Sequence, residues 1–228
     1  RRPPSSTLFP YTTLFRSELA ALSALAARRG FALISDEVFL DYRFADRPGD
    51  VRVAAAEPGD ALVFSLGGLS KSAALPQLKL GWILANGPAA PLAEALERLA
   101  WIADSYLSVG TPVQLALPGL LSFGETAARA LRARLLGNHA ALVRALAPLA
   151  AVTVAPLPAG WSGVVRLPAV EREEELVLRL LAEEDLVVHP GYFFDFPHEA
   201  FLVLSLLPED ETFGEGVARL ARALTRRD

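Results

Sequence analysis

The apolar residues of the chain follow two patterns, short continuous runs and longer stretches with helical spacing. The runs at 31–35, 61–66 and 81–84 have the length and composition of buried strands. The stretches at 18–29 and 88–107 instead place apolar residues three or four positions apart, as one face of a helix does. Strands that alternate with helices predict an α/β sheet within the first 107 residues.

The second half of the chain has a different order of elements. Helical spacing continues to Leu146, with a break expected at Pro118, and short apolar runs then alternate with two further helical stretches. The predicted strands are 152–155, 163–167, 186–188 and 201–207, and the predicted helices are 171–184, whose acids form a solvated face, and 210–225. This order is typical of a small α+β unit.

We therefore predict three parts along the chain. Residues 1–17 contain no alanine and show no regular period, so they form an irregular segment, for which an artefactual origin and an ordinary flexible terminus are both open. Residues 18–107 are the remnant of a large domain, and residues 108–228 form a small C-terminal domain. Because residue 1 is arginine and the sequence contains no methionine, we expect a fragment, a processed chain or a misjoined reading frame.

Composition narrows the class of function. The 228 residues contain no cysteine, so disulfides and thiolate metal ligands are excluded, and His189 and His198 lack the spacing of a metal site. The net charge of −4 argues against a nucleic-acid surface, and no apolar stretch has the character of a transmembrane helix. We expect a cytoplasmic protein with no metal and no membrane or nucleic-acid partner.

The stretch at 61–86 carries the strongest candidate chemistry. Lys71 follows the carboxyl end of a predicted strand, where open α/β sheets place their reactive groups. Gly67 and Gly68 come just before Ser70 and Lys71 and let the backbone approach a ligand closely. A lysine in an apolar setting can lose its proton and form a Schiff base. From position alone, a solvated loop lysine is the alternative.

A carboxylate ends the preceding strand. Asp36 and Glu37 stand directly after the run at 31–35, so an acid and Lys71 both follow strands of the same predicted sheet. An acid that caps the next turn is the structural alternative.

These segments resemble those of the class I/II aminotransferases, the fold-type I enzymes that use pyridoxal 5′-phosphate (PLP). In GLSKSAALPQLKLGW, Ser70 stands directly before the lysine, and Lys79 follows eight positions after it, succeeded by an apolar residue, Gly81 and Trp82. The segment SDEVFLDY is similar to the one that carries the family's aspartate. The resemblance covers residues 18–228 and implies a partial large-domain sheet of the PLP-dependent transferase fold.

The resemblance also implies a role for each of these residues. Lys71 would hold PLP as a Schiff base and act as the catalytic residue, and Asp36, rather than Glu37, would pair with the protonated pyridine nitrogen. Ser70 and Lys79 would bind the phosphate. A lysine keeps the charge of the family's usual arginine but lacks the planar guanidinium that forms two parallel hydrogen bonds. A surface position at a strand entrance is the alternative for Lys79.

The sequence departs from the family at several positions. Phe39 stands where a tyrosine commonly bonds the cofactor's phenolic oxygen, and Tyr42 is only a remote replacement. Gly68 occupies the position of a phosphate-binding serine. Val203 stands where an arginine usually reads the substrate carboxylate, which leaves Arg166 as a weak candidate for substrate binding.

The implied function is a PLP-dependent aminotransferase, which transfers an amino group from an amino acid or amine to a 2-oxo acid. The family pattern implies a homodimer when full length, and an isolated fragment without activity. One alternative is another fold-type I PLP enzyme, such as a β-lyase, because the residues around the lysine do not decide which Cα bond breaks. The other is a non-catalytic aminotransferase-like binding domain.

Overall fold

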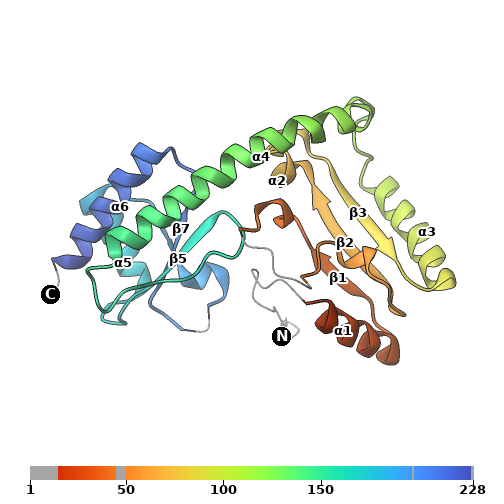
Figure 1. The fold of residues 1–228 in the computed structure, drawn as a ribbon, viewed down its shortest axis with the longest axis horizontal. Helices are drawn as coiled ribbons and strands as arrows, with labels where there is room; N and C mark the ends of the chain where they lie inside the picture. The colour runs from red at the N-terminus through yellow and green to blue at the C-terminus, as the bar shows by residue number, and fades with distance from the viewer. Residues whose placement is uncertain (1–14, 45–49, 197, 227–228) are drawn as a thin grey trace. The chain divides into compact units, whose positions relative to one another are not determined.

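The structure is a computed structural model that describes residues 15–44, 50–196 and 198–226. Its contacts divide the chain into two compact units, with the division after Arg129. The first unit holds a three-stranded mixed sheet and the second a four-stranded antiparallel sheet, so the predicted α/β class is confirmed (Figure 1). The domain boundary predicted at residue 107 stays a prediction.

The sheet of the first unit has the order β1-β2-β3, with β1 at Leu33–Asp36, β2 at Val63–Gly68 and β3 at Gly81–Asn86. β1 and β2 run parallel, and β3 returns antiparallel beside β2. The remaining elements of this unit are α1 (Arg16–Arg29), η1 (Leu40–Tyr42), η2 (Ala54–Ala56), α2 (Leu69–Ser72), η3 (Pro76–Leu78), α3 (Ala89–Ser105) and the first part of α4 (Thr111–Leu146).

α1 begins at Arg16, two residues before the predicted start of the ordered chain. The Glu18 carboxylate accepts a hydrogen bond from the Phe15 backbone N–H at 2.7 Å, and Arg16 pairs with Glu57 at 2.7 Å. Both contacts stabilise the first turn, whose backbone N–H groups have no helical partner. The helix ends at Gly30, which has a φ of 69° that a residue without a Cβ adopts readily. Residues 1–14 lie outside the described residues.

Among the described residues, two apolar clusters pack the first unit. One joins Leu19 of α1 to Val63 of β2, and the other surrounds Leu69, just after β2. Other apolar side chains of this unit stay in solvent: Ile34 of β1 is 71% exposed, and α3 buries none of its residues. The stripe that predicted α3 therefore marks an exposed apolar surface in the chain as it stands.

α4 runs unbroken from Thr111 to Leu146, so the break predicted at Pro118 is wrong. A proline removes one helical hydrogen bond, but the residues around it pack on both sides of that position. Val113 and Leu120 contact the cluster around Leu69, and this burial favours a continuous helix. No helix in the described part of the chain combines the length and hydropathy that crossing a bilayer requires.

The sheet of the second unit has the order β4-β5-β7-β6, and all its pairs are antiparallel. Its elements after α4 are β4 (Thr153–Val154), β5 (Ser162–Arg166), α5 (Glu173–Glu184), β6 (His189–Pro190), η4 (Gly191–Phe194), β7 (Phe201–Ser205) and α6 (Asp210–Thr225). The strand predicted at 186–188 lies instead at His189–Pro190. The reason is that Leu186 closes the end of α5, where its N–H donates to the Leu180 carbonyl.

Two acids of α5 are buried, which corrects the prediction that the acids of this helix form a solvated face. Glu173 is only 2% exposed, and its carboxylate accepts hydrogen bonds from the backbone N–H groups of Tyr192 at 3.0 Å and Phe201 at 2.7 Å. It therefore ties the first turn of α5 to η4 and to the start of β7. A helix period does not reveal such a role, because the partners are backbone groups far along the chain.

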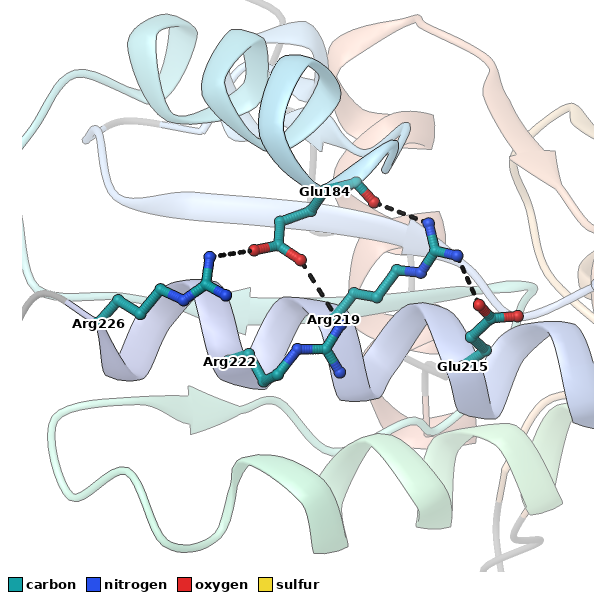
Figure 2. A network of polar contacts seen from close by, with 5 residues as sticks. All are labelled: Glu184, Glu215, Arg219, Arg222 and Arg226. Atoms are coloured by element: carbon teal, nitrogen blue, oxygen red, sulfur yellow. Dashed lines mark hydrogen bonds and ion pairs between the residues drawn. The ribbon is translucent and has the colours of Figure 1, made fainter.

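The second buried acid, Glu184, faces α6. Its carboxylate lies 3.0 Å from Arg226 and 3.6 Å from Arg222. Its backbone carbonyl accepts a hydrogen bond from Arg219, and Figure 2 shows the three arginines around Glu184. Arg219 also pairs with Glu215 one turn earlier in α6. These charges hold the end of α5 against α6, and the apolar side chains of Val217 and Leu220 are buried on the same helix.

Replacement of Glu173 should destabilise the second unit. In Glu173→Ala, the N–H groups of Tyr192 and Phe201 lose their acceptor, and such losses in a buried setting cost about 2–4 kcal/mol in total. We expect a lower urea midpoint and faster hydrogen exchange at these two amides. Glu174→Ala, at an exposed neighbour, is the matched control and should change stability by less than about 0.5 kcal/mol. Equal effects of the two substitutions would contradict this role of Glu173.

Candidate active site

The candidate residues of the first unit gather at one edge of its sheet. β1 and β2 are parallel, so their carboxyl ends meet at the same edge, and the antiparallel β3 begins there. In this register Asp36 lies beside Leu66, and Gly68 lies beside Gly81. Asp36, Lys71 and Lys79 therefore occupy the same edge, although 43 positions separate the first from the last.

Asp36 presents an open carboxylate at this edge. It is the last residue of β1 and is exposed, and its Oδ1 accepts a hydrogen bond from the Val38 N–H at 3.3 Å. Oδ2 is not engaged by any of the described residues. The turn that follows β1 thus orients the side chain and leaves one oxygen open to a ligand.

Glu37 forms hydrogen bonds within the unit. Its Oε1 accepts hydrogen bonds from the Ala54 N–H at 2.7 Å and from the Ser65 hydroxyl at 2.8 Å, and Ser65 in turn accepts one from the Ala55 N–H. This network joins β1, β2 and η2 in the middle of the unit. The two adjacent acids therefore have different surroundings, because successive residues leave a strand in opposite directions.

Lys71 lies in α2, a helix of one turn directly after β2. The turn is anchored by Leu69, which is fully buried and whose N–H donates to the Leu80 carbonyl at 3.0 Å. Ala74 then adopts a φ of 54°, which ends the turn. Lys71 is half-buried, and its Nζ lies 5.9 Å from the centre of the Phe39 ring, within the range of a cation–π contact.

Tyr42 is fully buried beside this turn. Its hydroxyl donates a hydrogen bond of 2.9 Å to the backbone carbonyl of Lys71. Burial raises the pKa of Tyr42 to about 12, with a smaller contribution from the negative charge of Asp41. Tyr42 therefore stays protonated near neutral pH, as this hydrogen bond requires.

Ser70 and Lys79 lie close to Lys71 along the sheet edge. Ser70 is half-buried in the same turn. Lys79 is exposed just before β3, and the next residue, Leu80, is the one whose carbonyl accepts the hydrogen bond from the Leu69 N–H. Lys79 has a φ of 51° at the end of η3, a left-handed conformation that turns the chain into β3. Lys71 and Lys79 are the only two lysines of the sequence.

Gly67 is constrained by packing within the sheet. A Cβ at this position would lie 2.4 Å from Nε1 of Trp82, its partner on β3. The absence of a side chain at Gly67 makes room for the indole.

The candidates of the second unit stand on its central strands. Val203 is 3% exposed in β7, between Val164 of β5 and His189 of β6, so it is part of the core of that sheet. Arg166 is exposed at the end of β5, beside Phe201, and none of the described residues forms an ion pair with it. No group of three metal-ligating side chains occurs among the described residues.

The edge of the first unit thus combines an amine, a second cation and a carboxylate. An amine can bind an aldehyde covalently, a cation can hold an anionic group of the same ligand, and a carboxylate can bind a protonated ring nitrogen. Sequence reasoning found Asp36 and Lys71 from their places after predicted strands, and Lys79 from the resemblance of its segment to the aminotransferase motif. It gave Tyr42 only a remote role and did not find Ser65, because no local pattern distinguishes a buried hydroxyl with a distant partner.

Comparison with known sequences identifies relatives of this chain. The family model for aminotransferase class I and II matches residues 12–220. Alanine aminotransferase of Mycobacterium bovis is 25% identical over 214 residues, which are 90% of this chain and 49% of that protein. Glutamate-pyruvate aminotransferase AlaA of Haemophilus influenzae is 26% identical over 215 residues, which are 91% of this chain and 52% of that protein. The chain spans about half the length of the curated relatives it matches.

Solved structures give the same assignment of fold. Alanine aminotransferase from Pyrococcus furiosus matches with a TM-score of 0.78 and 18% identity, covering 92% of this chain and 53% of the other. Tyrosine aminotransferase from Leishmania infantum also matches with a TM-score of 0.78, at 20% identity, covering 93% of this chain and 53% of the other. At these identities the likeness establishes the fold alone.

Tyr42 should make the first unit sensitive to alkaline pH. Its pKa is about 12 in the folded chain and lies near 10 when the residue is unfolded and solvated, so above pH 10 the unfolded chain loses this proton first. The stabilisation that Tyr42 contributes is therefore fully present below pH 10 and is lost as the pH rises toward about 12. This loss lowers the free energy of unfolding by about 2–3 kcal/mol.

We measure the free energy of unfolding at pH 10 and at about pH 12 and expect the decrease between them to be smaller in Tyr42→Phe, because the titrating hydroxyl is absent. The matched control, Tyr192→Phe, removes the hydroxyl of a half-exposed tyrosine and should keep the full loss. An unchanged pH dependence in Tyr42→Phe would contradict the assignment.

Proposed function

The chain belongs to the aminotransferase class I and II family, and from this membership we propose that it is the carboxyl-terminal part of a PLP-dependent aminotransferase. The proposed reaction transfers an amino group between an amino acid or amine and a 2-oxo acid. The main support for the proposal is that Asp36 and the turn with Lys71 lie at the same edge of the first sheet. PLP, when bound, supplies an aldehyde and an electron-accepting ring.

The residues at this edge fit PLP. Its aldehyde needs an amine, its phosphate needs cations or N–H donors, and its protonated ring nitrogen needs a carboxylate. Lys71, Lys79 and Asp36 offer these groups from three neighbouring segments, and Oδ2 of Asp36 is open among the described residues. The proposal assigns the ring nitrogen to Asp36 and the phosphate to Ser70 and Lys79.

Lys71 is the proposed catalytic residue. Its amine would hold the cofactor through the cofactor's aldehyde group. When it is not bound to the cofactor, the same amine would take the proton from the substrate's Cα and carry it as a general base and acid. Both steps need Nζ at a fixed place, and the short turn that begins at the buried Leu69 supports such a placement.

The amino donor and the 2-oxo acid acceptor are proposed only as classes. Val203 is a neutral side chain in the core of its sheet, so it does not bind a substrate carboxylate. Arg166, exposed on the neighbouring strand, is the candidate for this role in the chain. We further propose that the full-length protein is a cytoplasmic homodimer, as the family pattern implies.

Removal of the Lys71 amine should abolish covalent binding of PLP. We expect the chain, extended to the length of its relatives, to form a visible absorbance band with PLP that borohydride eliminates. Lys71→Ala should lack the band entirely, since it removes the amine that is proposed to bind the aldehyde. Lys79→Ala should keep the band but bind PLP about tenfold or more weakly, because a charge-assisted contact to phosphate is lost. Loss of the band in Lys79→Ala, with retention in Lys71→Ala, would contradict the assignment.

Turnover should depend on the rest of the protein. Residues 1–228 span about half the length of the relatives, and catalysis depends strongly on complete positioning of the reacting groups. We expect the 228-residue chain to produce no 2-oxo acid from a panel of α-amino acids, and the extended chain to produce it. The same assay should score elimination products, since their predominance in the extended chain would identify a lyase instead. Turnover by the 228-residue chain alone would contradict the proposal that it is one part of a longer enzyme.

A further inference from the structure

The turn that carries Lys71 is too short to hold its own shape. α2 has four residues, and an isolated helical turn is unstable because its few hydrogen bonds do not offset the entropy lost in forming it. Its geometry must therefore come from tertiary contacts. Leu69 supplies one, through its buried side chain and its hydrogen bond to Leu80, but both lie at the start of the turn.

A second contact acts at Lys71 itself. The carbonyl oxygen of Lys71 accepts a hydrogen bond from the Ala74 N–H at 3.1 Å and another from the Tyr42 hydroxyl at 2.9 Å. The first is local to the turn, whereas the second comes from a residue 29 positions earlier. Tyr42 is fully buried, so its ring is fixed by packing and its hydroxyl cannot be replaced by water without cost.

The same short segment also reaches the side chain of the lysine. Phe39 and Tyr42 stand at the two ends of η1, and the Tyr42 N–H donates to the Phe39 carbonyl at 2.9 Å. The Phe39 ring lies 5.9 Å from Nζ of Lys71, while Tyr42 binds the carbonyl of the same residue. Residues 39–42 therefore contact Lys71 at both its backbone and its ammonium group.

We propose that Tyr42 is a positioning residue for Lys71: its buried hydroxyl fixes the backbone of the lysine and thereby sets where Nζ stands at the sheet edge. This inference rests on the proposed function, which makes Lys71 the amine that binds PLP. Tyr42 acts through Lys71 and does not replace the ligand contact missing at Phe39, because its hydroxyl is buried on a backbone carbonyl.

The two lysines of the chain allow a test with an internal reference. Lys79 lies at the same edge on η3 and β3, outside the turn that Tyr42 holds, so its reactivity reports folding and access. The chain is incubated with PLP and reduced with borohydride, and peptide mapping gives the ratio of labelled Lys71 to labelled Lys79. We expect Lys71 to dominate in the wild type and the ratio to fall at least about fivefold in Tyr42→Phe, which keeps the ring and its volume. Tyr192→Phe is the matched control and should keep the wild-type ratio.

A second measurement needs no cofactor. In the wild-type chain, hydrogen exchange at the Ala74 amide should require the same opening as exchange at the Tyr42 amide, because the hydroxyl bond joins the two segments. In Tyr42→Phe the Ala74 amide should exchange at least about fivefold faster, with the Ala85 amide of β3 unchanged.

The outcomes separate this inference from the proposed function. A wild-type ratio in folded Tyr42→Phe, or Ala74 exchange much faster than Tyr42 exchange in the wild type, overturns the positioning role and leaves the PLP site intact. Label confined to Lys79 in the wild type overturns the proposed function. In that case the hydrogen-exchange result alone decides whether Tyr42 holds the turn.

Discussion

The parallel pairing of β1 with β2 is the constraint on which the candidate site depends. Parallel strands place their carboxyl ends at one edge, so the register that sets Asp36 beside Leu66 also brings the Lys71 turn to that edge. A shift of one residue would turn Asp36 inward and expose Glu37 in its place. The buried network of Glu37 and Ser65 opposes that shift, because both of its members would lose their partners.

Buried polar groups have a similar task elsewhere in the chain. Tyr42 joins the segment after β1 to the turn after β2, Glu173 joins α5 to β7, and Glu184 joins α5 to α6. Each is a polar group whose partners come from another segment. Such contacts add little net stability, but a buried polar group that loses its partner costs free energy. They therefore favour one arrangement of segments over others.

The sequence was sufficient for those features that depend on local pattern. The positions of β1, β2 and β3, the acid and lysine that follow the first two of these strands, and the closing helix at 210–225 follow from apolar period and flanking residues, and α6 has the predicted bounds. Local pattern failed where a distant partner decides the outcome. Pro118 lies inside a helix because its neighbours pack on another segment, and Glu173 is buried because two distant N–H groups need an acceptor.

The central claim is that the sheet edge bearing Asp36, Lys71 and Lys79 is a PLP site. The most direct measurement is a crystal structure of the chain, extended to the length of its relatives and grown with PLP. We predict electron density continuous from Nζ of Lys71 to the cofactor, the carboxylate of Asp36 at the ring nitrogen, and the phosphate beside Ser70 and Lys79. A cofactor bound covalently to Lys79, or seated away from this edge, would contradict the claim.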